Sequence, residues 1–223
     1  MQNILPRPIL QIQQNDRRYP ARLNDLYDPP GQIYIQGDAR LLNMPMIAIV
    51  GSRAASSSGL RNAAWFAQGL SKAGVLVISG LARGIDGAAH QAVLELGEDY
   101  FTAAVCGTGL DITYPREHLG LARAIIQQGA LISELPLGIG PKPFHFPRRN
   151  RLIAALALGV VVIEAAERSG SLITARLAAD LGREVFALPG PIHSDNSAGC
   201  HLLIQQGAKL VFRPQDVLEE LHF

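Results

Sequence analysis

Residues 46–79, MIAIVGSRAASSSGLRNAAWFAQGLSKAGVLVIS, decide the fold of this chain. Two apolar runs, 46–50 and 75–79, flank a segment that is predicted to be a helix over Asn62–Lys72. Uninterrupted runs of Val, Ile and Leu are typical of strands that are buried on both faces of a sheet. A strand, a helix and a second strand in succession therefore predict a parallel pair joined by a helical crossover.

The same alternation continues to the end of the chain. Further strands are expected at residues 101–106, 130–133, 160–165 and 184–190, and further helices at 86–96, at 116–128, from about Asn150, and at 171–182. A short helix, the strand AKLVF and a last helix are expected to close the chain. The pattern predicts an α/β fold whose mostly parallel sheet is covered by helices on both faces.

Residues 1–45 have a different character from the rest. They are rich in Pro, Gln and Asn, and they contain one short strand candidate, QIYIQG at 32–37. We interpret them as a lead-in segment that packs on a core domain formed by residues 46–223.

Composition narrows the class of protein. The net charge of +1 argues against a wholly basic, histone-like protein. Cys106 and Cys200 lie far apart and the six histidines are scattered, so the sequence predicts no metal site. No apolar run reaches transmembrane length and the N-terminus lacks the apolar core of a signal peptide, so we expect a reduced, cytoplasmic protein without a membrane segment.

Glycine and small hydroxyl residues follow four of the predicted strands. The loops are GSRAASSSG at 51–59, SGLARGIDGAAH at 79–90, CGTGLDITYP at 106–115 and ERSGSLITA at 167–175. In parallel sheets ligands bind beyond the carboxyl ends of the strands, and helix N-termini favour phosphate. With Arg53 in the first loop and Arg168 in the last, the four loops predict a phosphate-binding rim. Turning alone also favours glycine in such loops, and Arg53 could instead pair with Glu164 to fix its loop.

Enzyme signatures are missing from these loops. None fits the dinucleotide motif G-x-G-x-x-G, the P-loop, the nucleophile elbow G-x-S-x-G or the zinc motif H-E-x-x-H. The carboxylates near the loops form no acid–base pair by sequence, and Asp86 is expected to cap its helix. The sequence therefore predicts a binding protein with no cofactor, rather than an enzyme.

Residues 144–159, FHFPRRNRLIAALALG, place cations and aromatic rings at the start of a predicted helix. Helix N-termini already carry partial positive charge, so Arg148, Arg149 and Arg151 are unfavourable there unless an anion is bound. Nucleic-acid phosphates would satisfy the arginines, and Phe144 and Phe146 could stack on unpaired bases. In the alternative, Phe146 packs as a hydrophobic staple, Asn150 caps the helix, and the arginines lie in water.

Six ordered motifs resemble the DNA processing protein A family (DprA, also called Smf). They are AIVGSR, SGLARGIDGAAH, GTGLDITYP, FPRRNRLIA, VVVIEAAERSGSLITARLA and VFALPG, and the resemblance runs from about Tyr19 to Leu221. It implies an extended Rossmann fold that binds single-stranded DNA, forms a homodimer and loads the recombinase RecA in natural transformation. Two departures are His118, where many relatives have asparagine, and the segment from Gly199 to Ile204.

The motifs and the resemblance together give the candidate DNA-binding residues. The resemblance implies DNA binding by the arginine of GSR, the lysine before FPRRNR, the aromatic residue before RNR, and residues of the segment SGSLITA. The full set comprises Ser52, Arg53, Gly80, Lys142, Phe144, Phe146, Arg148, Arg149, Asn150, Arg151, Ser169, Gly170, Ser171 and Thr174.

Two other functions remain open at this point. A nucleotide-processing enzyme of the phosphoribohydrolase (lysine-decarboxylase-like) type would resemble this chain in its glycine-rich loops, but the loop SGSLITARL has Ala175 and Arg176 where such enzymes carry a catalytic glutamate. A nucleotide sensor would bind a mononucleotide and show no preference for longer strands.

Overall fold

The computed structural model describes residues 7–223. A single mixed sheet of nine strands runs through this part of the chain in the order β1-β2-β6-β5-β4-β3-β7-β8-β9. The strands are β1 (Ile9–Gln13), β2 (Gln32–Gly37), β3 (Met46–Val50), β4 (Leu76–Ser79), β5 (Thr102–Val105), β6 (Ala130–Ser133), β7 (Gly159–Val162), β8 (Glu184–Ala187) and β9 (Lys209–Leu210). The strands from β3 to β9 pair with one another in parallel, whereas β1 pairs antiparallel with β2 and β2 pairs antiparallel with β6.

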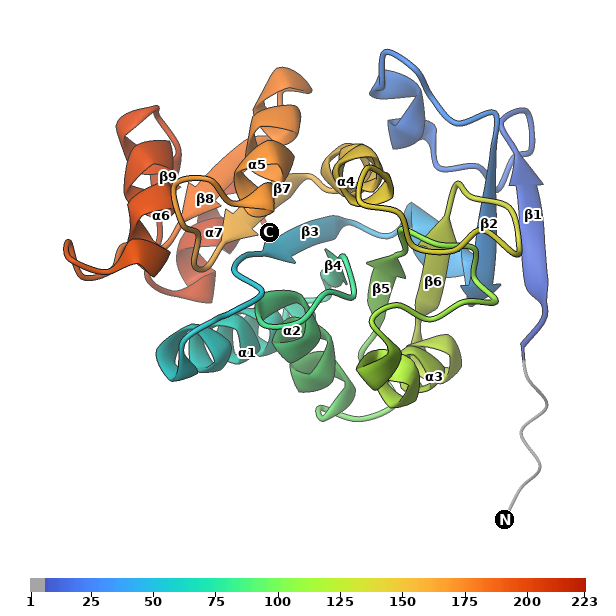
Figure 1. The fold of residues 1–223 in the computed structure, drawn as a ribbon, viewed down its shortest axis with the longest axis horizontal. Helices are drawn as coiled ribbons and strands as arrows, with labels where there is room; N and C mark the ends of the chain where they lie inside the picture. The colour runs from blue at the N-terminus through green and yellow to red at the C-terminus, as the bar shows by residue number, and fades with distance from the viewer. Residues whose placement is uncertain (1–6) are drawn as a thin grey trace.

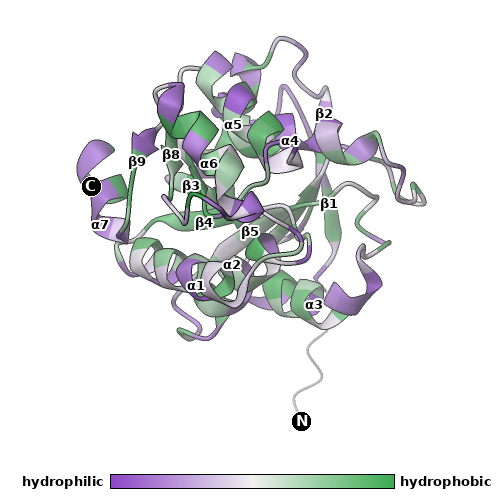
Figure 2. Cartoon of the chain, turned by 60° about the vertical axis from the view of Figure 1, so that its left-hand side comes forward, coloured by the Kyte–Doolittle hydropathy of each residue, from purple (hydrophilic) through white to green (hydrophobic). Residues whose placement is uncertain are grey.

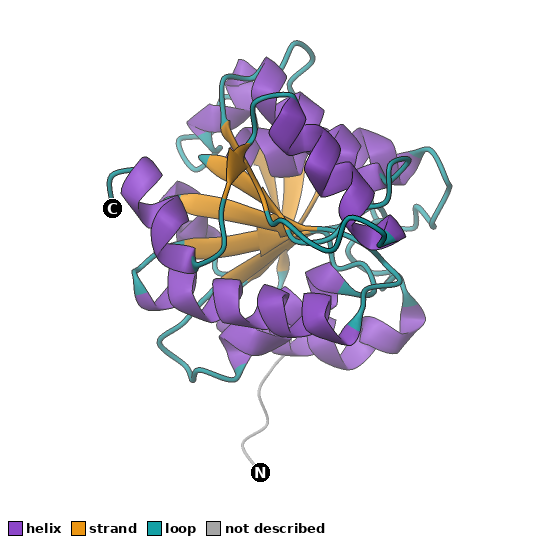
Figure 3. Cartoon of the chain, turned by 90° about the vertical axis from the view of Figure 1, so that its left-hand side faces the viewer, coloured by secondary structure: helices purple, strands orange, loops and turns teal. Residues whose placement is uncertain are grey.

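Helices cover both faces of the twisted sheet (Figures 1 and 3). One layer contains α1 (Ser57–Lys72), α2 (Ile85–Leu94), α3 (Leu119–Gln128) and α7 (Pro214–Glu220); the other contains α4 (His145–Leu156), α5 (Gly170–Asp180) and α6 (Asp195–Gln205). Short 3-10 helices lie at η1 (Ala21–Asp25), η2 (Ala39–Asn43) and η3 (Arg116–His118). The predicted α/β class with a mostly parallel, doubly covered sheet is confirmed.

Alternating residues of the central strand divide the core into two layers. Met46, Ala48 and Val50 of β3 pack with residues of α4, α5 and η1. Ile47 and Ile49 point to the other face and pack with α1 and α2. Because a strand presents successive side chains to opposite faces, this central strand must be apolar throughout. Figure 2 shows the resulting pattern, with hydrophobic strands inside and mixed, more hydrophilic helices outside.

The N-terminal segment contributes more to the sheet than the sequence indicated. We expected one strand before Met46, but β1 precedes β2 and pairs with it from Ile9↔Gln36 to Gln13↔Gln32. The strand β2 in turn pairs with β6 of the core, and its Ile33 and Ile35 are fully buried. Residues 7–45 are thus joined to the rest of the described chain by backbone hydrogen bonds and by a shared apolar layer.

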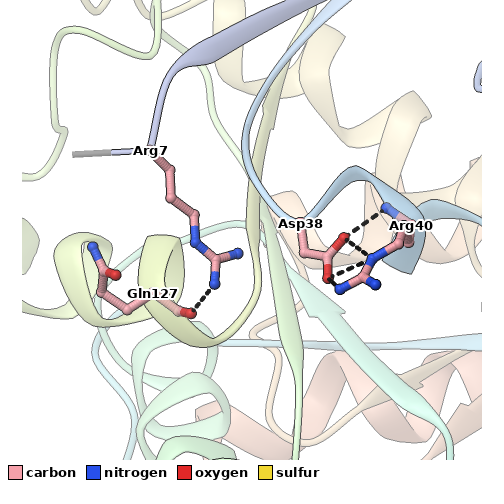
Figure 4. Close-up of polar contacts among 4 residues, drawn as sticks. All are labelled: Arg7, Asp38, Arg40 and Gln127. Carbon is pink, nitrogen blue, oxygen red and sulfur yellow. Dashed lines mark hydrogen bonds and ion pairs between the residues drawn. The ribbon is translucent and has the colours of Figure 1, made fainter. Parts of the chain in front are cut away.

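Polar contacts hold the ends of this segment (Figure 4). Arg7 donates from Nη2 to the carbonyl oxygen of Gln127 in α3 at 2.8 Å. Asp38 begins η2 by accepting the amide of Arg40 at 2.9 Å, and it also binds the Arg40 guanidinium. Both contacts are exposed, so they contribute little to stability, and their main effect is to direct the path of the chain.

Two helices begin about five residues earlier than the sequence predicted. α1 begins at Ser57 rather than at Asn62, because the Ser56 side chain accepts the Gly59 amide and caps it. α4 begins at His145 rather than near Asn150, so the arginines lie within its first two turns. Pro147 does not prevent this, because the first turn of a helix has no intrahelical partner for its amides.

We predict that Gly37→Ala destabilises the fold by about 1–3 kcal/mol or more. Gly37 has φ +126°, and a Cβ atom there would collide with the carbonyl oxygen of Gly129 and come within 2.8 Å of the Ala130 Cα. Gly31→Ala is the matched control, because a Cβ at Gly31 would meet nothing within 4 Å. Urea denaturation of both variants checks this. Equal stabilities would contradict the close approach of β2 to the start of β6.

Candidate nucleic-acid interface

The candidate site lies beside β3, where the order of the strands in the sheet reverses. β3 has β4 on one side and β7 on the other, so the loops that leave β3 and β7 diverge at their carboxyl ends. The two loops stay joined near their starts, since the Ser52 amide donates to the Glu164 carbonyl oxygen at 2.7 Å. Above this point α4 lies between α5 and the N-terminal segment (Figure 1).

A cavity of about 420 Å³ opens at this crossing. Eight of the residues predicted to bind DNA line it, and they come from the loop after β3, from α4 and from the start of α5: Ser52, Arg53, Arg149, Asn150, Ser169, Gly170, Ser171 and Thr174. The structure therefore brings together residues that are separated by more than a hundred positions in the sequence. A larger cavity of about 570 Å³ between α5 and α6 contains fewer of the predicted residues and is mostly apolar.

A second, smaller cavity of about 50 Å³ adjoins the first. Arg53 and Arg149 line both cavities, and Gly80 and Phe146 line the smaller one. The remaining walls are Ala82, Arg83, Tyr114 and Pro115, which sequence reasoning did not select. We define the two cavities together as the cleft.

Arg53 is the exposed cation of the cleft. Its guanidinium carbon lies 5.6 Å from the centre of the Phe146 ring. The alternative that Arg53 pairs with Glu164 does not describe this structure, because Glu164 accepts hydrogen bonds from the amide and hydroxyl of Ser56 at the start of α1. Among the described residues Arg53 forms no salt bridge, so its charge is available to a ligand.

Arg149 differs from the expectation that it lies at the surface. It is only 5% exposed, and its Nη1 donates to the carbonyl oxygens of Gly80, at 2.5 Å, and Val105. Burial lowers the pKa of this guanidinium, and the positive charge of Arg53 lowers it further, while Asp86 opposes the effect. Arg149 therefore holds the loop after β4 and the end of β5 to α4.

Asp86 is the buried acid that faces Arg149. It does not cap α2 as predicted, because it is the second residue of that helix. Its Oδ2 instead accepts the amides of Gly80 at 3.1 Å and Ala82 at 3.3 Å. Burial raises the pKa of Asp86, and Arg149 lowers it. The pair thus fixes both the amide and the carbonyl of Gly80.

The other two arginines of α4 are bound to one carboxylate. Glu134 forms ion pairs with Arg148, at 3.3 Å, and with Arg151, which also donates to the Asp28 carbonyl oxygen. The Arg151 side chain is 14% exposed, whereas that of Arg148 is 56% exposed. Arg151 is consequently committed to the protein, and Arg148 retains access to solvent.

Lys142 and Phe144 lie before the helix and outside both cavities. Lys142 Nζ is 5.9 Å from the centre of the Phe144 ring, and the ring itself is exposed. Phe146 is partly buried and stacks on Tyr114, so it is neither a fully exposed platform nor a core staple. Asn150 does not cap the helix; its Nδ2 donates to the Gly170 carbonyl oxygen at 3.2 Å and connects α4 to α5.

The start of α5 presents hydroxyls and amides to the larger cavity of the cleft. Ser169 caps this helix by accepting the Ser171 amide at 3.3 Å, and the two hydroxyls lie 2.7 Å apart. Thr174, one turn further along, is 1% exposed and lines the same cavity. Partial positive charge at a helix N-terminus and hydroxyl donors together favour an oxyanion.

The described residues, 7–223, show neither a metal-ligand cluster nor a membrane-spanning helix. No cluster of three or more His, Cys, Asp or Glu side chains that could hold a metal ion occurs there. Within the same range, no helix combines the length and apolar character needed to cross a membrane.

The chain is similar to one family of known proteins over nearly its whole length. The profile of the family described as DNA recombination-mediator protein A matches residues 11–222.

The chain belongs to the DNA recombination-mediator protein A family.

Three relatives illustrate the similarity. Protein Smf of Escherichia coli is 50% identical over 206 residues, which cover 92% of this chain and 54% of that protein. The X-ray structure of DNA processing protein A from Streptococcus pneumoniae has a TM-score of 0.91 and 47% identity, covering 95% of this chain and 74% of that one. DNA processing protein A from Helicobacter pylori, studied for its single-stranded DNA binding mode, has a TM-score of 0.86 and 29% identity, covering 96% of each chain.

The matched lengths set the scope of the comparison. The chain spans about half the length of the Escherichia coli relative. The family and its Rossmann-like fold are nevertheless secure, because the matched region includes every strand from β3 to β9 and both cavities of the cleft.

We predict unequal stability effects for substitutions of the two arginines that line both cavities. Arg149→Met should lower the free energy of unfolding by about 1–3 kcal/mol, because it leaves two buried carbonyls without a donor and removes the cation that faces Asp86. Arg53→Ala should change it by less than about 0.5 kcal/mol, as expected for an exposed side chain. Denaturant unfolding without DNA measures both. A clear loss of stability in Arg53→Ala would make Arg53 a structural residue.

Proposed function

We propose that the cleft binds single-stranded DNA and that the protein acts as a non-enzymatic mediator that loads the recombinase RecA onto that DNA. The observation that carries the proposal is Arg53, an exposed cation placed between an aromatic pair and a rim of hydroxyls and helix amides. Single strands need this combination, because phosphates bind cations and unpaired bases stack on aromatic rings. The DNA-processing family, and the Helicobacter pylori relative in particular, support it.

The ligand contacts are proposed residue by residue. Arg53, Lys142 and Arg148 are exposed cations that can bind phosphate. The hydroxyls of Ser52, Ser169, Ser171 and Thr174 and the amide of Gly170 form a second phosphate site beside the start of α5. Phe144 and Phe146 contact bases, whereas Arg149, Asn150 and Arg151 act mainly by holding Gly80, α5 and Glu134 in place.

An enzymatic function has less support. The carboxylate that lines the larger cavity of the cleft is Asp86, and its Oδ2 already accepts two loop amides. A general base needs a free position toward its substrate. Hydrolysis of a nucleotide by the purified protein would favour the enzyme instead.

Homodimer formation and a cytoplasmic location complete the proposal. β9 is the last strand of the sheet, and Leu210 and Phe212 are exposed beside it. An exposed edge with apolar side chains favours pairing with a second copy. Light scattering should show a dimer that Phe212→Asp weakens and that Trp65→Asp, at an exposed ring on α1, leaves intact. A monomer at high micromolar concentration would contradict the dimer.

We predict salt-dependent binding of oligonucleotides with a preference for single strands. Since Arg53, Lys142 and Arg148 neutralise about two to three phosphates, log affinity should fall with log salt with a slope of roughly −1.5 to −2. Arg53→Ala should weaken binding and reduce the slope by about 0.7, and Arg53→Lys should recover only part of the affinity, because lysine lacks the two-pronged guanidinium. Fluorescence anisotropy with oligothymidylate measures this.

A matched control lies on α1, away from the cleft. Lys72→Ala removes one charge at the last residue of α1, at the opposite end of that helix from the cleft, and should leave the affinity unchanged. Equal affinity for a duplex, or binding that does not depend on salt, would contradict the proposal. Equal affinity for a mononucleotide and a long strand would favour the nucleotide sensor.

A further inference from the structure

Tyr114 is the most exposed aromatic ring of the cleft. It follows β5 and η3 follows it, and its side chain is 46% exposed beside Pro115 in the wall of the smaller cavity. Its ring centre is 5.2 Å from that of Phe146, with the two planes tilted by 40°. A large exposed ring next to several cations is suited to bind a ligand that has a π-face.

Phe146 is more enclosed than Tyr114. Its ring packs on Gly107 so closely that a Cβ atom at Gly107 would lie 2.8 Å from Phe146 Cδ1. The Arg53 guanidinium lies over the ring, and Tyr114 contacts it from another direction. Phe146 therefore supports the pair from within, and Tyr114 presents its ring outward.

Two cations line the same cavity as this pair. Arg53 comes from the loop after β3, and Arg83 comes from the loop after β4, where it forms an exposed ion pair with Glu117. A nucleotide has one charged phosphate on each side of its base along the strand. Two cations and a ring in the walls of one cavity are thus suited to one unpaired nucleotide and its flanking phosphates.

We propose that Tyr114 is a second base-stacking residue, on whose outward face one unpaired base lies, with Phe146 as the ring that supports it. The inference rests on the proposed function, since it adds a residue to the single-stranded DNA site. Bases in a duplex are already stacked and paired, so Tyr114 favours single strands over duplex. The Tyr114 ring contacts the π-face of a base, and every base has such a face.

Three substitutions at two positions test this role. Tyr114→Leu, which keeps volume but removes the ring, should weaken oligothymidylate binding by roughly 5- to 150-fold, the value of one stacked base. Tyr114→Phe should bind within about twofold of the wild type, because stacking needs the ring and not the hydroxyl. Trp65→Leu, at an exposed ring on α1 outside the cleft, is the matched control and should bind as the wild type does.

Two further measurements distinguish a Tyr114 that stacks on a base from a Tyr114 that only supports the Phe146 ring. In a Phe146→Ala background, Tyr114→Leu should still weaken binding, whereas a residue that acts only through Phe146 would have no further effect. An oligonucleotide that carries the fluorescent base 2-aminopurine should be quenched on binding by the wild type and by Tyr114→Phe, and less so by Tyr114→Leu. Thermal melts verify that each variant is folded, as expected for an exposed side chain.

The outcomes distinguish this inference from the proposed function. If the wild type binds no single-stranded oligonucleotide, the proposed function and this inference both fail. If the wild type binds and Tyr114→Leu binds equally well with equal quenching, the stacking role of Tyr114 alone is overturned. It is also overturned if Tyr114→Phe is as weak as Tyr114→Leu, because the hydroxyl would then be the group that matters.

Discussion

The buried guanidinium of Arg149 is the contact on which the cleft depends. It joins the carbonyl of Gly80, just after β4, and that of Val105, the last residue of the neighbouring β5, to the first turns of α4. Asp86 completes the arrangement by binding the amides of Gly80 and Ala82 from below. A buried charge is tolerated only when it is paired and hydrogen-bonded, so the positions of α4 and both loops are coupled. Phe146, three residues before Arg149, is placed by the same contact.

This coupling explains why arginines occur at the start of a helix. An N-terminus disfavours cations, yet each of the three arginines has a specific partner: Arg149 binds carbonyls, and Arg148 and Arg151 share Glu134. The protein itself therefore satisfies part of the charge that the sequence assigned to DNA. What remains for a ligand is the charge of Arg53, with Lys142 and the exposed part of Arg148, next to the hydroxyls at the start of α5. A cleft with few free cations and two rings is suited to a flexible single strand more than to the dense charge of a duplex.

The sequence predicted the sheet and the loops well, for a physical reason. Buried parallel strands require continuous apolar runs, and MIAIV, VLVIS and VVVIEA have them. It failed at β1, ILQIQ, because an edge strand is half-exposed and its alternating glutamines resemble loop composition. The burial of Arg149 could not be foreseen, since its carbonyl partners lie 69 and 44 residues away in sequence. Tyr114 was quoted within its motif but not selected, because only folding brings it against Phe146.

The most direct test is a crystal structure of the protein with a short oligothymidylate. The account predicts a phosphate on the Arg53 guanidinium, a second near the amides of Gly170 and Ser171, and a base against Tyr114, while Arg149 stays on the carbonyls of Gly80 and Val105. A strand bound away from the carboxyl ends of β3, β4 and β7, or an Arg149 that leaves the core to bind phosphate, would contradict it.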